Sequence, residues 1–115
     1  MSHSINWVFT ATQYLCFGNL ISVLAQRLAS KENKTTEEHI YQLLLLKLQK
    51  NMSGKMLYAG YYPDVEFKLK LDYISALTFW ECCSWGLLND LTQDSLESVI
   101  TAEVCRDIHQ KLLTK

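Results

Sequence analysis

The sequence predicts an all-α fold, a compact bundle of about four main helices in one domain spanning residues 1–115. Three observations support this prediction: apolar residues recur at helical spacing in long segments, a capping-box pair marks a helix start, and the chain contains a single proline. The 115 residues, of which 49% are hydrophobic, can bury one core without disulfides or metal. A short β-hairpin around residues 55–72 is the alternative for one segment.

The first predicted helix covers residues 5–29, with Ser4 as its N-cap. Gly18 inside this helix costs about 1 kcal/mol relative to alanine, so we expect another helix to pack closely against it. Polar residues interrupt the apolar run, which is therefore interpreted as a buried core helix and not as a membrane span. These residues are Asn6, Gln13, Asn19 and Gln26.

A second helix is predicted from Thr35 onward. Thr35 and Glu38 have the capping-box spacing, in which the hydroxyl and the carboxylate each accept a hydrogen bond from an otherwise unpaired backbone amide. Because glycine readily ends a helix, we expect this one to stop near Ser53–Gly54. Ile40, Leu44, Leu48 and Met52 follow i, i+4 steps and so lie on one face of this helix.

The stretch YYPDVEFKLKLDY, residues 61–73, supports two interpretations. From Val65 to Tyr73 its apolar residues alternate with polar ones, as in a half-buried strand, and this strand would form a hairpin with residues 55–60. Alternatively, Pro63 occupies the first position of a helix, where its missing amide is harmless. We favour the helix, because a lone hairpin is only marginally stable and the residues that follow are strongly helical.

A third helix is predicted within residues 74–91, where apolar residues lie almost all the way round, as in the central helix of a domain. The last helix follows Thr92 or Asp94, either of which can cap it. Lys111 and Lys115 lie at its end, where the helix dipole favours positive charge.

Composition and charge narrow the classes of function. The net charge of −1 argues against nucleic-acid binding, which requires a basic surface. The four cysteines, Cys16, Cys82, Cys83 and Cys105, are interpreted as reduced thiols. Two of them are adjacent, and the sequence shows no signal-peptide pattern. We therefore expect a cytoplasmic protein that binds neither nucleic acid nor membrane.

Candidate catalytic groups are few. Cys105 and His109 stand one helical turn apart, a spacing suited to a metal or to a thiolate and its base, yet Cys105 also belongs to an apolar stripe and is better interpreted as a buried side chain. The adjacent cysteines and the tryptophans beside them are interpreted as core in the same way. Motifs for phosphate binding or hydrolysis are absent from the sequence, so we expect no catalysis, no metal and no cofactor.

Surface tyrosines supply the best candidate for a binding site. Tyrosine offers a large contact area with a polar tip, and interfaces are enriched in it. Three tyrosines and two acidic residues, near the connection between the second and third helices, predict a patch suited to a partner with basic and apolar features. They are Tyr58, Tyr61, Tyr62, Asp64 and Glu66. The alternative is that these rings cover the end of the bundle.

In its size, helical pattern, cysteine content and lack of catalytic motifs, the whole chain resembles the immunity proteins that bacteria encode beside contact-dependent or polymorphic toxins. That resemblance implies a protein that binds one cognate toxin, often a nuclease, in a one-to-one complex and neutralises it by occluding the active site. The five patch residues are then the expected contacts. Many such proteins are distinctly acidic, and the net charge of −1 departs from that habit.

A second hypothesis is a self-associating helical module or small adaptor without catalytic activity. The aromatic residues of the first and third predicted helices would then form a homodimer face, since a chain that is 49% hydrophobic can leave such a surface exposed. The mass of the particle in solution separates this hypothesis from the first.

Overall fold

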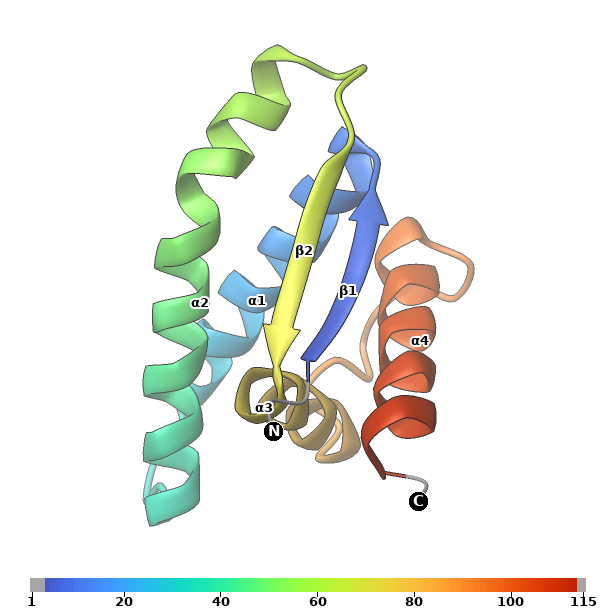
Figure 1. Ribbon diagram of the computed structural model, residues 1–115. Helices are drawn as coiled ribbons and strands as arrows, with labels where there is room; N and C mark the ends of the chain where they lie inside the picture. Colours follow the sequence, from blue (N-terminus) through green and yellow to red (C-terminus); the bar gives the residue numbers. More distant parts are fainter. Residues whose placement is uncertain (1–3, 114–115) are drawn as a thin grey trace.

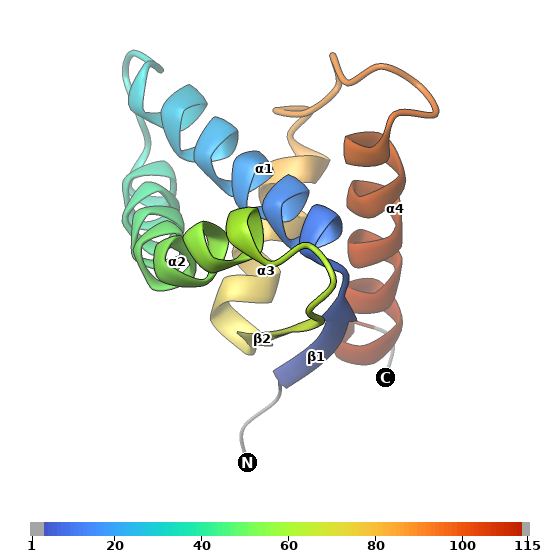
Figure 2. The ribbon, with the colours of Figure 1, turned by 90° about the horizontal axis from the view of Figure 1, so that it is seen from above.

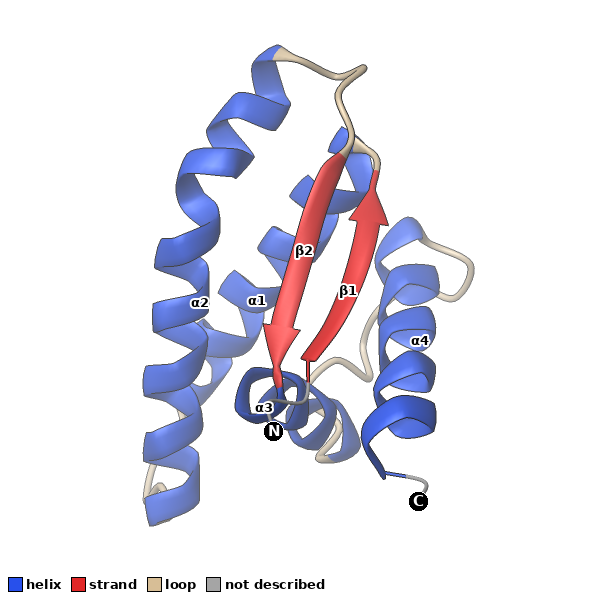
Figure 3. Ribbon diagram, viewed as in Figure 1, coloured by secondary structure: helices blue, strands red, loops and turns tan. Residues whose placement is uncertain are grey.

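The computed structural model describes residues 4–113, which form four helices and a small two-stranded antiparallel sheet (Figures 1 and 3). The predicted, mostly helical fold is therefore confirmed, whereas the all-α class is wrong because of the two strands. Lys115, expected at the end of the last helix, lies outside the described residues. In chain order the elements are β1 (Ser4–Phe9), α1 (Ala11–Ala29), α2 (Thr36–Tyr61), β2 (Phe67–Asp72), α3 (Tyr73–Ser84), α4 (Leu96–Ile108) and a π-helical turn, η1 (His109–Leu113).

The segment 4–9 is a strand, and the prediction that a helix begins at residue 5 with Ser4 as its N-cap is wrong. β1 pairs with β2 so that Trp7 lies opposite Leu69. A helix would distribute the alternating apolar residues of β1 around its axis, whereas a strand places them on one face. Pairing brings together six side chains, each buried in the core: Ile5, Trp7, Phe9, Phe67, Leu69 and Leu71.

α1 starts with a capping box that directly follows β1. The Thr10 hydroxyl accepts a hydrogen bond from the Gln13 amide (3.1 Å), and the Thr10 amide donates to the Gln13 side-chain oxygen (2.9 Å). Farther along, Gly18 lies where α1 packs on α2, and a methyl group at that position would overlap the Met56 thioether. The close helix packing predicted at Gly18 is therefore confirmed.

α2 starts as predicted but continues farther. The Thr35 hydroxyl accepts from the Glu38 amide (3.2 Å), and the Glu38 carboxylate accepts from the Thr35 amide (2.8 Å). The expected stop near Ser53–Gly54 is wrong, since the helix extends to Tyr61. It passes the glycine because core contacts are made on both sides of it, and tertiary packing outweighs the intrinsic cost of glycine in a helix. The residues that make these contacts are Met52 and Ala59.

The stretch YYPDVEFKLKLDY forms a strand at residues 67–72, and the favoured helix with Pro63 at its first position is wrong. The hairpin alternative named the wrong partner, because residues 55–60 belong to α2 and the true partner is β1. The strand ends at Asp72, whose carboxylate accepts from the Ser75 amide (2.8 Å) and caps α3.

The apolar region 74–91 is helical only in its first part, which belongs to α3. Gly86 then adopts a left-handed backbone conformation (φ 81°) that residues with a Cβ adopt at a cost, and the chain turns there. Ser95 caps α4, so the expectation that Thr92 or Asp94 would do so is wrong.

The helices cover one face of the sheet and leave the other open (Figure 2). α2 lies beyond β2 and α4 lies beyond β1 (Figure 1). The Trp7 indole of β1 donates a hydrogen bond to the Asp107 carboxylate of α4 (2.9 Å). Four exposed residues lie on the open face: Asn6, Val8, Lys68 and Lys70. None of the described helices is both long and apolar enough to cross a membrane.

Candidate protein-binding surface

The five residues predicted to bind a partner lie together at one end of the molecule, where α2 ends and the chain turns toward β2 (top of Figure 1). Tyr58 and Tyr61 belong to the last turn of α2, and Tyr62 is its C-cap, so two of the three tyrosines are helical and not in the connection. We call this surface the aromatic–acidic patch; it comprises Tyr58, Tyr61, Tyr62, Asp64 and Glu66.

Backbone and ring contacts hold the patch in one conformation. The Tyr62 amide donates to the Tyr58 carbonyl (3.0 Å), and the Val65 amide donates to the Tyr62 carbonyl (3.3 Å). The rings of Tyr58 and Tyr62 lie 4.4 Å apart between centroids. Tyr58 also meets the buried Phe67 edge-on at 6.0 Å, which anchors the patch to the core. The alternative that these rings cover the end of the fold thus holds in part for Tyr58.

The patch nevertheless leaves much of its aromatic surface in solvent. Tyr61 is 75% exposed, Tyr62 52% and Tyr58 48%. Leu57 and Val65, which the sequence reasoning did not include, add exposed apolar area beside them. The last turn of α2 contains no basic residue. Asp64 and Glu66 therefore lend the patch negative charge beside a helix end whose dipole is also negative.

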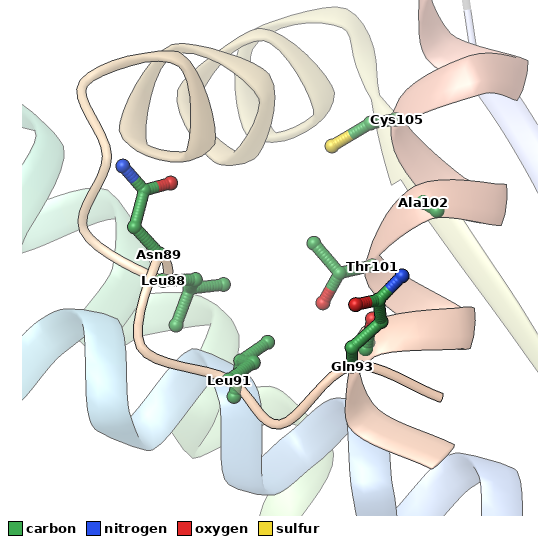
Figure 4. A pocket seen from close by; sticks show the side chains of 8 residues that line it. Leu88, Asn89, Leu91, Gln93, Thr101, Ala102 and Cys105 are labelled. Atoms are coloured by element: carbon green, nitrogen blue, oxygen red, sulfur yellow. The ribbon is translucent and has the colours of Figure 1, made fainter. Parts of the chain in front are cut away.

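A hollow of about 400 Å³ lies between α4 and the segment that joins it to α3 (Figure 4). Leu88 and Leu91 supply apolar walls, and Cys105 and Thr101 face them from α4. The Thr101 hydroxyl oxygen is buried and makes no hydrogen bond. The hollow offers neutral polar groups and no charged side chain among its lining residues.

An ion pair secures the segment that forms this hollow. Both terminal nitrogens of Arg27, on α1, donate to the Asp90 carboxylate at 2.7 Å, and one also donates to the Leu87 carbonyl. These hydrogen bonds hold the pKa of Asp90 below its usual range. Asp90 therefore stabilises the fold through its pair with Arg27. It does not cap the last helix, whose N-cap is Ser95.

The thiol and imidazole considered as a catalytic or metal pair contact different partners. Cys105 shares a hydrogen bond with Cys83, which raises the pKa of the Cys83 thiol and lowers that of Cys105. The exposed His109 ring stacks on Trp80 instead, at 6.3 Å between centroids. The geometry therefore gives Cys105 a second thiol as its neighbour and not a base.

The remaining cysteines are core residues. Burial raises the pKa of Cys16 to about 11 and that of Cys82 to about 12, so both stay protonated near neutral pH. All four cysteines are free thiols. Within residues 4–113, no group of three or more His, Cys, Asp or Glu side chains is arranged to hold a metal ion.

Most of the homodimer face suggested by the sequence is buried. Phe17 of α1 and Phe79 of α3 are fully buried, with ring centroids 5.1 Å apart. α2 carries four exposed aliphatic side chains, those of Ile40, Leu43, Leu46 and Leu57. Most of the aromatic residues that were expected to bind a second copy thus belong to the core, whereas Trp85 is 40% exposed.

Comparisons of the chain with models of protein families, with curated proteins and with solved structures found no match. The aromatic–acidic patch joins exposed rings, local rigidity and negative charge on one surface, and this combination suits the binding of another protein.

Proposed function

We propose that this chain is a protein-binding domain of the immunity-protein type, which neutralises a cognate bacterial toxin in a one-to-one complex. The observation that carries the proposal is the gathering of Tyr58, Tyr61 and Tyr62 with two carboxylates on one exposed surface. The resemblance in size, helical pattern and lack of catalytic motifs supports the toxin as the class of partner.

The mechanism follows from the chemistry of the patch. Tyr61, the most exposed ring, would insert into an apolar recess of the toxin, where a few central aromatic residues supply most of the binding energy. Asp64 and Glu66 would face basic residues at the rim of that recess and raise the rate of association. A bound domain of 13.3 kDa then blocks the approach of substrate to the toxin's active site.

Substitution of the two most exposed tyrosines tests the proposal. Tyr61→Ala combined with Tyr62→Ala should weaken toxin binding by at least about 2 kcal/mol. The free energy of unfolding should change by no more than about 0.5 kcal/mol per site, because both rings are surface groups. The matched control is Leu43→Ala with Leu46→Ala, which removes two exposed apolar side chains from a different part of α2.

The assay has two parts. First, tagged wild-type protein and both double variants are used to recover partners from the native cell at high salt, with mass spectrometry of what is retained. Second, the recovered partner is expressed in a host cell with and without each variant. We expect the partner to stop growth, and the wild type and the control to restore it. Retention of the partner by the tyrosine variant, or a partner without toxicity, would contradict the proposal.

The exposed apolar residues of α2 support a second candidate, a self-associating module. Leu43 is 67% exposed and Leu46 is 43% exposed, and a second copy would bury them. Light scattering across a range of concentrations tests this candidate. A dimer that the leucine variant converts to a monomer would favour it, whereas a wild-type monomer at high concentration would remove it.

A further inference from the structure

The strand β2 has a neighbour on one side alone. It pairs with β1, and apart from that ladder the main chain of residues 67–71 makes no hydrogen bond to the rest of the described chain. In an antiparallel strand every second residue directs its N–H and C=O away from its partner. β2 therefore carries a row of free donors and acceptors along the side that faces α2 (Figure 1).

A groove of about 400 Å³ lies between α2 and β2 at this free edge and extends across β2 to Asn6 of β1. Its apolar lining comes from Leu48 and Met52 of α2 and from Leu69 of β2. Tyr14, whose side chain is 2% exposed and whose ring lies 5.2 Å from that of Phe67, also lines the groove. Asn6 of β1 and Asn51 of α2 supply neutral polar groups to the same groove.

The groove is positively charged. Lys55 of α2 and Lys68 and Lys70 of β2 line it, and the ion pairs of the described residues involve none of the three. We call this feature the basic groove. The nearest acidic residue on the same strand, Asp72, is already engaged as the cap of α3. The three lysines thus gather positive charge in one groove of a chain whose net charge is −1.

From this arrangement we propose that the basic groove binds an extended acidic segment of a partner protein, which adds to the sheet as a third strand beside β2. Main-chain hydrogen bonds to the free edge supply part of the binding, as in other complexes where a peptide extends a sheet. Side chains of the added strand alternate between two faces. Acidic residues then lie beside Lys68 and Lys70 on the open face, and apolar residues lie over Leu69 and Met52.

Charge also selects this occupant over others. A second copy of β2 would place its own lysines beside Lys68 and Lys70, and like charges on neighbouring strands repel each other. A nucleic-acid strand offers phosphates but cannot complete a β-ladder, and the acidic Asp64 and Glu66 at the end of the groove's strand oppose it. The inference is independent of the proposed function, because the aromatic–acidic patch has the opposite charge and lies beyond the end of β2.

An NMR titration of the full chain tests this inference. The probe is a blocked eight-residue peptide in which Glu and Val alternate. Two control peptides have Lys in place of Glu, or Pro in place of Val; the latter keeps the charge but loses main-chain donors. We expect saturable amide shifts at residues 67–72 with the Glu–Val peptide, and slower hydrogen exchange there. Both control peptides should bind at least about tenfold more weakly.

Variants locate the site. The double variant Lys68→Glu with Lys70→Glu should reduce affinity for the Glu–Val peptide about tenfold or more. The control, Lys50→Glu with Lys111→Glu, makes an equal change of charge outside the groove and should reduce affinity by less than about twofold. Both pairs are exposed, and their amide spectra report whether each variant is folded. Four outcomes would each overturn the inference. The proline peptide could bind as tightly as the Glu–Val peptide, or a single-stranded oligonucleotide could bind more tightly. The chain could instead self-associate through the same amides, or the Glu–Val peptide could fail to bind at millimolar concentration.

Discussion

The starts of α1 and α2 use the same device with different chemistry. At α1 the capping box joins Thr10 to Gln13, a neutral pair in solvent. At α2 it joins Thr35 to Glu38, whose carboxylate is 4% exposed and also pairs with Lys31. Identical hydrogen-bond topology therefore occurs once with an amide and once with a buried, paired carboxylate.

This difference separates two contributions that a capping box makes. Both boxes satisfy backbone amides that the helix leaves unpaired. Only a charged box also interacts with the helix dipole and with a neighbouring cation, and that part depends on pH. The Glu38 carboxylate, held by hydrogen bonds from Lys31 and from the Thr35 amide, has a pKa below its usual range.

Removal of the two cap hydroxyls should have the largest effect and should distinguish the boxes. Thr35→Ala leaves the Glu38 amide without its acceptor in a partly buried site, so we expect a loss of about 1–2 kcal/mol in the free energy of unfolding. Thr10→Ala should cost about 0.5 kcal/mol, because water replaces the lost acceptor. Urea unfolding of both variants measures the difference, and equal losses would show that exposure of the box is irrelevant.

Acid should weaken the second box and leave the first unchanged. Because the pKa of Glu38 is lowered by folding, its contribution to stability is present above its ordinary pKa and is lost as the pH falls through the lower, folded-state value. Glu38→Gln should therefore be less stable than wild type near pH 7, with the difference vanishing in acid. Urea unfolding from about pH 7 to about pH 3 measures both proteins.

A control is needed because Asp90 also has a lowered pKa, through its hydrogen bonds with Arg27. Asp90→Asn removes that contribution and should leave the Glu38 part of the acid sensitivity in place. A Glu38→Gln variant that loses as much stability in acid as the wild type would mean that the carboxylate of the second box is not the titrating group.

Conversion of the neutral box into a charged one should have the smallest effect. The first turn of α1 contains no acidic residue. Gln13→Glu retains the acceptor for the Thr10 amide and adds a favourable charge near the helix start, so we expect a gain of about 0.3–1 kcal/mol near pH 7. Thermal unfolding at low and high salt checks this, since added salt should reduce the gain. A gain that persists in acid would contradict a charge effect.

The same pair of boxes explains how far sequence reasoning reached. Thr35 and Glu38 were recognised, and α2 starts there. The spacing from Thr10 to Gln13 is the same, and it would have moved the start of the first helix to residue 11. It was obscured because the alternating residues Ile5, Trp7 and Phe9 merge with the long apolar run that follows them.

The strand pairing was beyond local reasoning for a physical reason. The alternation in residues 67–72 indicates a strand, but a strand requires a partner, and local reasoning offers only the adjacent residues 55–60. Those residues have no local feature that excludes a strand, yet their contacts with α1 and the core make them helical. Residues 4–9, which do pair with β2, are remote in sequence, and a single sequence gives no signal for such contacts.

The candidate site was more accessible to sequence reasoning. Clustered tyrosines near a proline predict an exposed turn, and Tyr61 and Tyr62 are exposed, although Tyr61 belongs to the last turn of α2 and not to the connection. What was not predictable is the anchoring of Tyr58 on Phe67, because it depends on β2 being a strand. The basic groove depends on the same strand. Lys68 and Lys70 are two residues apart, so they lie on one face in a strand and on different faces in a helix.

The register of the sheet has a consequence for the order in which the chain folds. Phe9 pairs with Phe67, so the ribosome makes β1 about sixty residues before its partner. During that interval the apolar side of β1 has no strand beside it. The α1–α2 hairpin, which is built from contacts close in sequence, is free to form first and brings the two strands together. We therefore expect sheet closure to be a late step, which leaves the apolar side of β1 open to aggregation in the nascent chain until then.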